Sequence, residues 1–235
     1  MISAIDLSHK ALRWQELIQS AAQSIRPVVQ LSDQQRLVWL DLSGANTRLA
    51  AIQVADTGGL DAFICAECSR QEGIGGIGGY MEDRRLYLRS AVFAGEEHRT
   101  LHLGVDIWLP AHTPIYAALG GRVHSFADNA GFGNYGPTII LEHQLEEITF
   151  YTLYGHLSRQ SLLELEEGKP VAAGEQIASL GTAEENGDWP PHLHFQIMLD
   201  MEGMKGDYPG VAAPSRADYY RLRCPDPNIL LKFPL

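Results

Sequence analysis

The sequence predicts a mainly β protein, either a sheet or a barrel, preceded by an N-terminal extension that mixes a helix with short strands. From about residue 84 onward, stretches of alternating apolar and polar residues recur between glycine, proline and asparagine, as in LHLGVDIWLP, GPTIILEH and HLHFQIML. Short strands with regularly spaced turn signals are typical of all-β sheets and barrels. Before residue 84 the pattern differs, because one long segment there has helical spacing.

The N-terminal extension is expected to contain a helix followed by strands. Apolar residues recur at near-helical spacing from Ser8 to Ile25, and Pro27 ends the pattern. The stretches RLVWLDLSG (36–44) and RLAAIQVAD (48–56) predict short strands, with Gly58-Gly59 as a break. The glycine-rich stretch EGIGGIGGY (72–80) is expected to be a flexible connector or a tight loop, since it lacks the Lys-Ser/Thr of a phosphate loop.

The composition limits the partners of this chain. Its 235 residues are enough for one large domain or one domain with an extension. The formal net charge is −11 and no basic block stands out, so we expect no nucleic-acid partner. No apolar run approaches the ~20 residues of a membrane span, and the first residues do not form a secretory signal. A cytoplasmic location is therefore expected, unless a leader has been trimmed.

Two histidines stand one residue apart in PPHLHFQIML, residues 190–199. Apolar residues alternate there with His192, His194 and Gln196, which predicts a strand with one apolar face. Because residues i and i+2 share a face of a strand, both imidazoles should point the same way. The alternative is a pair of surface histidines on an edge strand.

A second pattern, His102-Leu-Gly-Val-Asp106, suits a metal site together with this strand. A straight strand would separate its ends by about 13 Å, but Gly104 can allow a bend that brings both side chains to one ion. His194 can supply a third ligand. Two imidazoles and one carboxylate suit zinc and leave a fourth position open.

Two further histidines are candidates for catalysis. His192 can stand beside the metal without binding it, and His156, in YTLYGHLS, follows a strand that would bring its ring to the same rim. Histidine suits proton transfer because its ordinary pKa lies near neutral pH. The alternative is a polar rim that only orders water. His124 and His143 are expected to be edge-strand histidines.

The motifs HLGVD, YGHLS and PHLHF, in this order, resemble those of the LytM/lysostaphin-type zinc metallopeptidases, which are peptidase family M23. The connecting segments LPAHTPIYAALGGRV and GKPVAAGEQIASLGT are also similar to that family. The resemblance covers roughly residues 84–200 and implies an antiparallel β structure with zinc in a groove. It implies zinc ligands at His102, Asp106 and His194, and catalytic histidines at His156 and His192.

The resemblance also implies a division of the chain and an activity. Residues 1–83 would be an N-terminal α/β extension, 84–200 an M23-like zinc peptidase domain, and 201–235 a tail that packs on it. The expected function is a zinc-dependent endopeptidase acting on peptides or peptidoglycan-type cross-links. One alternative is a non-catalytic module that holds zinc and binds a peptide or a partner domain. Another is an iron oxygenase with two histidines and one carboxylate.

Three segments further resemble a sub-group of the family, namely GPTIILEH, ENGDWPPHLHFQIMLD and CPDPNILL. Members of that sub-group are parts of long fusion proteins with kinase-like and class III aminotransferase-like parts. This resemblance implies neighbouring domains of a longer protein as partners, and it weakens the expectation of peptidoglycan as the substrate.

Overall fold

A large sheet forms the centre of the protein. The computed structural model describes residues 4–50, 52 and 56–234. Eight strands lie in the order β1-β2-β4-β11-β8-β7-β6-β9, and all neighbours are antiparallel except β1 and β2. These strands are β1 (Leu37–Trp39), β2 (Gly75–Gly78), β4 (Val105–Trp108), β6 (Gly121–Asn129), β7 (Gly136–Leu145), β8 (Ile148–Gly155), β9 (Pro170–Val171) and β11 (His192–Met198). The predicted mainly β, antiparallel architecture is confirmed.

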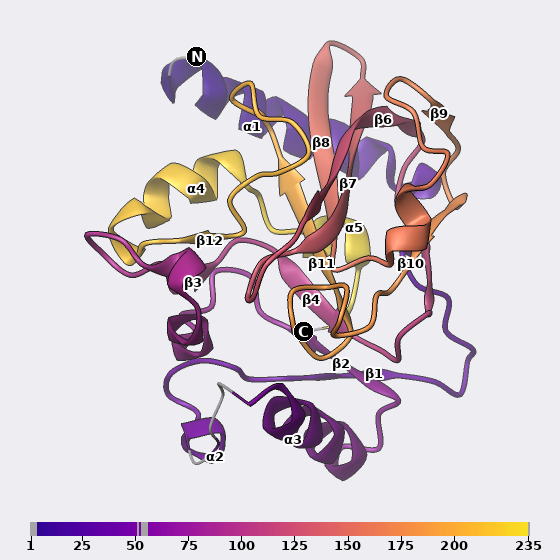
Figure 1. The fold of residues 1–235 in the computed structure, drawn as a ribbon. Helices are drawn as coiled ribbons and strands as arrows, with labels where there is room; N and C mark the ends of the chain where they lie inside the picture. Colours follow the sequence, from indigo (N-terminus) through magenta and orange to yellow (C-terminus); the bar gives the residue numbers. More distant parts are fainter. Residues whose placement is uncertain (1–3, 51, 53–55, 235) are drawn as a thin grey trace.

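Smaller elements surround this sheet (Figure 1). Two pairs of short strands form separate sheets: β5 (Pro114–Tyr116) with β10 (Gln176–Ser179), and β3 (Leu101–His102) with β12 (Val211–Ala212). The α-helices are α1 (Ala4–Ser20), α2 (Thr47–Ala50), α3 (Thr57–Arg70), α4 (Ala217–Arg223) and α5 (Asn228–Leu231). The 3-10 helices are η1 (Ala22–Ser24), η2 (Arg85–Arg89), η3 (Ala91–Phe93), η4 (Arg159–Leu162) and η5 (Pro214–Arg216). No helix among the described residues has the length and apolar character needed to cross a membrane.

The first helix is close to its predicted position. It starts at Ala4 rather than Ser8, ends at Ser20, and is followed by the single turn of η1. Its buried residues Trp14 and Ile18 belong to the main apolar core, and Trp14 meets Phe150 of β8 edge-on at 5.7 Å between ring centroids. The helix therefore covers the sheet near β7 and β8 (Figure 1).

The prediction of a strand at residues 48–56 is wrong. The structure forms helix α2 at residues 47–50, while residues 51 and 53–55 lie outside the described part. Helix α3 follows, because the Asp56 side chain caps its first turn by accepting the Gly58 N–H at 3.0 Å. The predicted break at Gly58-Gly59 is therefore the start of a helix, and Leu60 and Ile64 behind it are buried at i,i+4 spacing.

The glycine-rich stretch predicted to be a connector is a strand of the main sheet. Strand β2 lies between β1 and β4, with Gly76 opposite Trp108. A Cβ at Gly75 would stand 2.3 Å from the Trp108 carbonyl oxygen, so this close approach requires glycine. Strands β1 and β2 are parallel and joined through α2 and α3, so residues from the N-terminal region extend the same sheet that holds β4.

A second apolar cluster ties the N-terminal helices to the centre of the protein. Leu60 and Phe63 of α3 pack with Tyr87 of η2, Trp108 of β4 and Trp189. The domain limits at residues 83 and 200 stay predictions. The structure places residues from both sides of residue 84 in one sheet and in one apolar cluster.

His124 and His143, which were expected on edge strands, lie on interior strands of the main sheet. His124 is on β6, and His143 is on β7, where its ring is buried with 2% of the residue exposed. The His143 Nδ1–H donates to the Gly120 carbonyl at 2.9 Å, so Nε2 accepts from the Thr152 hydroxyl at 2.7 Å. Burial lowers the pKa of His143 to about 4, which keeps the ring neutral.

Acidification is expected to destabilise the fold through His143. In the unfolded chain this ring takes up a proton below about pH 6.5, whereas the folded ring stays neutral down to about pH 4. Unfolding therefore binds a proton in this window, and the free energy of unfolding falls by up to about 3 kcal/mol as the pH is lowered through it. His143→Gln should lose less stability than the parent over this range in urea unfolding. Parallel curves for the two proteins would contradict the expectation.

Candidate metal centre

The chain bends between the two halves of the His102–Asp106 pattern, as predicted. His102 ends β3, which pairs with β12 outside the main sheet, and Asp106 lies in β4 of the main sheet. Gly104 lies in the gap between these strands, and a Cβ there would stand 2.6 Å from Cε1 of the His194 ring. Gly104 thus allows the bend and leaves space for the His194 ring.

Three neighbouring strands bring the remaining histidines to this point. His194 of β11 is paired with Asp106 of β4 on one side and with Gly155, the last residue of β8, on the other. His156 follows directly with a φ of 61°, a left-handed conformation that is strained for a non-glycine residue. Strand β11 is interior and His192 and His194 are both buried, so the alternative of two surface histidines on an edge strand is wrong.

Three donor atoms converge in the buried centre of this site. His102 Nε2 lies 2.9 Å from His194 Nδ1 and 3.2 Å from Asp106 Oδ1, and His194 Nδ1 lies 3.0 Å from the same oxygen. Asp106 and the two histidines are almost completely buried. The structure therefore brings together the three residues that were expected to bind metal.

The outward contacts of the two rings show that these donor atoms carry lone pairs. His102 Nδ1–H donates to the Gly79 carbonyl at 3.0 Å, which leaves Nε2 without a proton in the neutral ring. Gln196 directs its amide N–H to the Pro209 carbonyl at 3.1 Å, so its oxygen accepts from His194 Nε2–H at 2.9 Å. His194 Nδ1 therefore also carries no proton in the neutral ring. Two lone pairs and a carboxylate oxygen at such distances repel unless a cation lies between them, so the donor set fits a zinc ion.

The charges around the site favour the forms that bind metal. Burial lowers the pKa of His102 to about 4, and the Arg84 guanidinium acts in the same direction. Burial alone would raise the pKa of Asp106, but His102 and Arg84 hold it well below its usual range. The histidine is thus neutral and the aspartate is ionised near neutral pH. Metal ligands must be deprotonated in this way.

His156 and His192 form a second pair beside these three residues. Their ring centroids are 4.0 Å apart, and His192 Nε2 lies 3.9 Å from Asp106 Oδ1. Each Nδ1–H donates to a backbone carbonyl at 2.8 Å, to Asn186 from His156 and to Pro190 from His192. Both Nε2 atoms therefore remain free to accept or pass a proton. Burial lowers the pKa of both rings, so each is neutral and can act as a base.

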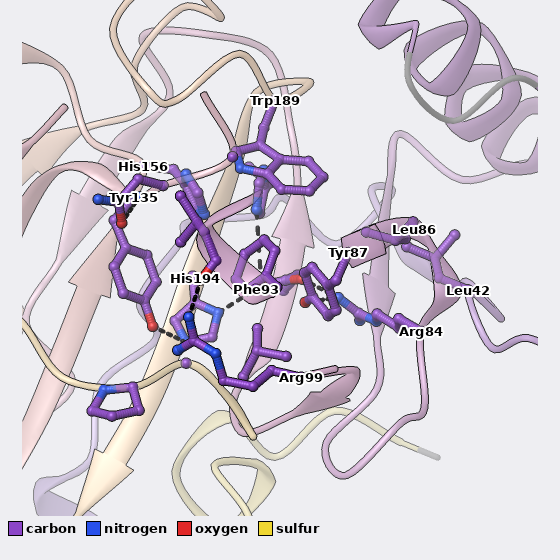
Figure 2. A pocket seen from close by; sticks show the side chains of 18 of the residues that line it. Leu42, Arg84, Leu86, Tyr87, Phe93, Arg99, Tyr135, His156, Trp189 and His194 are labelled. Atoms are coloured by element: carbon purple, nitrogen blue, oxygen red, sulfur yellow. Dashed lines mark hydrogen bonds and ion pairs between the residues drawn. The ribbon is translucent and has the colours of Figure 1, made fainter. Parts of the chain in front are cut away.

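A cavity of about 270 Å³ is lined by Asp106 and His194 of the first group and by His156 and His192 of the second. Figure 2 shows Tyr135, His156 and His194 on one side of it, with Tyr87 and Phe93 on the other and Trp189 near His156. Tyr135 is half-buried, and desolvation of its phenol raises the pKa well above the usual range. Aromatic walls and buried polar groups are typical of a small-ligand or catalytic pocket.

The sequence did not reveal the residues that orient the three candidate metal ligands. Gln196 shares a strand face with His192 and His194, so the period-two pattern of β11 could have identified it. Arg84 contacts Asp106 from 22 residues upstream, and Gly79 contacts His102 from 23 residues upstream. Neither position lies on a periodic face or in a motif that links it to its partner, so sequence patterns carry no signal for these contacts.

Comparison with known proteins shows that the part of the chain that carries this site is similar to a known family. The family model described as Peptidase family M23 matches residues 100–206, which include all five histidine and aspartate positions of the site. The chain is 35% identical over 94 residues to the uncharacterized lipoprotein YgeR of Escherichia coli, a match that covers 40% of this chain and 33% of that protein. It is 34% identical over 100 residues to the peptidoglycan DD-endopeptidase ShyC of Vibrio cholerae, covering 42% of this chain and 20% of that protein.

Among solved structures, the antimicrobial peptidase lysostaphin from Staphylococcus simulans is similar with 26% identity and a TM-score of 0.34. That match covers 52% of this chain and 45% of lysostaphin. The similarity to the two relatives found by sequence spans about a third and a fifth of their lengths.

Proposed function

We propose that this protein is a zinc-dependent endopeptidase that hydrolyses peptide bonds with metal-activated water, because residues 100–206 match the model of peptidase family M23. The observation that carries the proposal is the convergence of His102 Nε2, Asp106 Oδ1 and His194 Nδ1 within 3.2 Å, with hydrogen bonds that leave both nitrogens bare. Three protein ligands leave a fourth position open, which is typical of catalytic rather than structural zinc.

Within this proposal, each buried side chain has a distinct task. Zinc would act as a Lewis acid that polarises the scissile carbonyl and makes water acidic enough to ionise near neutral pH. His156 and His192 accept and return protons at Nε2, since each Nδ1 is held by a backbone carbonyl. Tyr87, Tyr135 and Trp189 line the cavity, exclude bulk water and hold the peptide against these rings.

The proposed substrate is a peptide, of the type found in peptidoglycan cross-links. Support comes from the relative ShyC, which is described as a peptidoglycan DD-endopeptidase and matches 42% of this chain. The alternative is a non-catalytic module that holds zinc and binds a peptide or a partner domain. Neighbouring domains of a longer protein stay a prediction of the sequence.

Incubation of the purified protein with peptidoglycan, and with a panel of glycine-rich and D-amino-acid peptides, tests the proposal. We expect new amino termini to appear, cleavage to stop with a chelator, and added zinc to restore it. Zinc bound at one equivalent without cleavage of any substrate would favour the non-catalytic module. Elemental analysis of protein purified without added metal tests the alternative of an iron oxygenase. Bound iron together with oxygen-dependent turnover would favour that alternative.

A further inference from the structure

A buried arginine lies directly behind the aspartate of the metal centre. The Arg84 side chain is 1% exposed, and its Nη1 donates to Asp106 Oδ2 at 2.5 Å. Arg84 precedes the region matched by the peptidase family, which begins at residue 100. It lies beside Tyr87 and Leu86, on the side of the cavity opposite His156 (Figure 2).

The two oxygens of Asp106 have different partners. Oδ1 faces the lone pairs of His102 Nε2 and His194 Nδ1, at 3.2 and 3.0 Å. Oδ2 is taken by Arg84. A carboxylate can bind a cation through one oxygen or through both. The arginine contact leaves only Oδ1 free to face the site, and it also balances the charge of a buried carboxylate.

Arg84 is itself held on several sides. Its Nε donates to Glu82 Oε2 at 2.6 Å, and the other oxygen of Glu82 accepts the Leu42 N–H at 3.0 Å. Nη1 also donates to the Tyr87 hydroxyl oxygen at 3.1 Å. The guanidinium lies 5.6 Å from the ring of Trp108, which stacks on His192. These contacts fix the guanidinium, so it can fix the carboxylate in turn.

We propose that Arg84 is a positioning residue of the metal centre, which commits Asp106 to binding through one oxygen. This proposal rests on the proposed function, because it assumes that the three converging side chains bind a divalent metal. Partners that orient metal ligands typically contribute about 10–100-fold to metal affinity. The positive charge of Arg84 opposes this effect by repelling a cation, so the sign of the measured change decides between orientation and repulsion.

Cobalt titration of metal-free protein tests the proposal without any substrate. Arg84→Met is expected to weaken Co²⁺ binding about 10–100-fold and to change the visible absorption of the bound ion, because the carboxylate can rotate. Arg84→Lys keeps the charge but cannot hold Asp106, Glu82 and Tyr87 with the same planar fork, so it should be intermediate. Arg85→Met is the control, because it removes the same charge from the exposed neighbouring residue. It should bind Co²⁺ with the affinity and the visible absorption of the parent.

These measurements distinguish a failure of the Arg84 proposal from a failure of the proposed metal centre. Co²⁺ binding by Arg84→Met that is as tight as in the parent, or tighter, would overturn the role of Arg84 and leave the proposed peptidase intact. A parent protein that binds no Co²⁺ would overturn the metal centre, and the role of Arg84 with it. Urea unfolding of the metal-free variants separates orientation from folding: loss of the cooperative transition in both Arg84 variants would assign the residue to the fold and overturn the proposal.

Discussion

Replacing His156 or His192 with glutamine is expected to lower kcat by about 10²–10⁴-fold while zinc stays bound at one equivalent. Both rings keep Nδ1 on a backbone carbonyl and present a bare Nε2, and neither belongs to the converging donor set. Loss of either ring therefore removes a proton acceptor without removing a ligand. The measurements are turnover of a cleaved peptide and elemental analysis of the same samples.

His124→Gln is the control for this pair, because His124 lies on β6 and contacts Ser125 and Tyr151 rather than the cavity. It should retain the turnover of the parent. Full activity in either His156→Gln or His192→Gln would show that the ring only borders the site. Loss of zinc together with activity would show that the ring is a ligand.

Replacing His194 with alanine is expected to abolish zinc binding and, with it, all hydrolysis. His194 supplies one of three converging donor atoms, and its ring is held by Gln196 on the far side. Zinc that binds only the folded state stabilises it by about 4 kcal/mol when its concentration is 1,000 times the dissociation constant. The parent should therefore melt at a higher temperature with zinc than with chelator, whereas His194→Ala should show no difference.

His98→Ala, a change at an exposed histidine, is the control for this measurement and should keep the zinc-dependent rise in melting temperature. If His194→Ala still bound one equivalent of zinc with the parent's thermal shift, the assignment of the metal ligands would be wrong.

The sequence predicted those parts of the site that depend on local pattern. The alternation in β11 placed His192 and His194 on one face, and Gly104 indicated the bend between His102 and Asp106. Both inferences rest on spacing along a single strand or turn. The strands between residues 101 and 198 were predictable for the same reason, since alternation and turn residues are local signals.

The parts that could not be predicted depend on contacts between distant segments. Strand β2 has no apolar alternation, and its place beside β4 follows from the space that glycine leaves next to the Trp108 carbonyl. Helix α3 has no clear sequence signal, because Gly58 and Gly59 are typical of a break in secondary structure, although Asp56 caps the turn that contains them. The ion pair between Arg84 and Asp106 joins the residue before η2 to a residue inside β4, and no periodicity relates these two positions.

The position of β2 in the sheet limits how this site can be transferred to another protein. β4 carries Asp106 and has β11 on one side and β2 on the other. An excised segment beginning at residue 100 would uncover one whole side of β4, and such an open strand readily pairs with other chains. The smallest transferable unit is therefore larger than the stretch matched by the family model. A graft into another scaffold would have to carry the preceding glycine strand and the buried arginine along with the histidines.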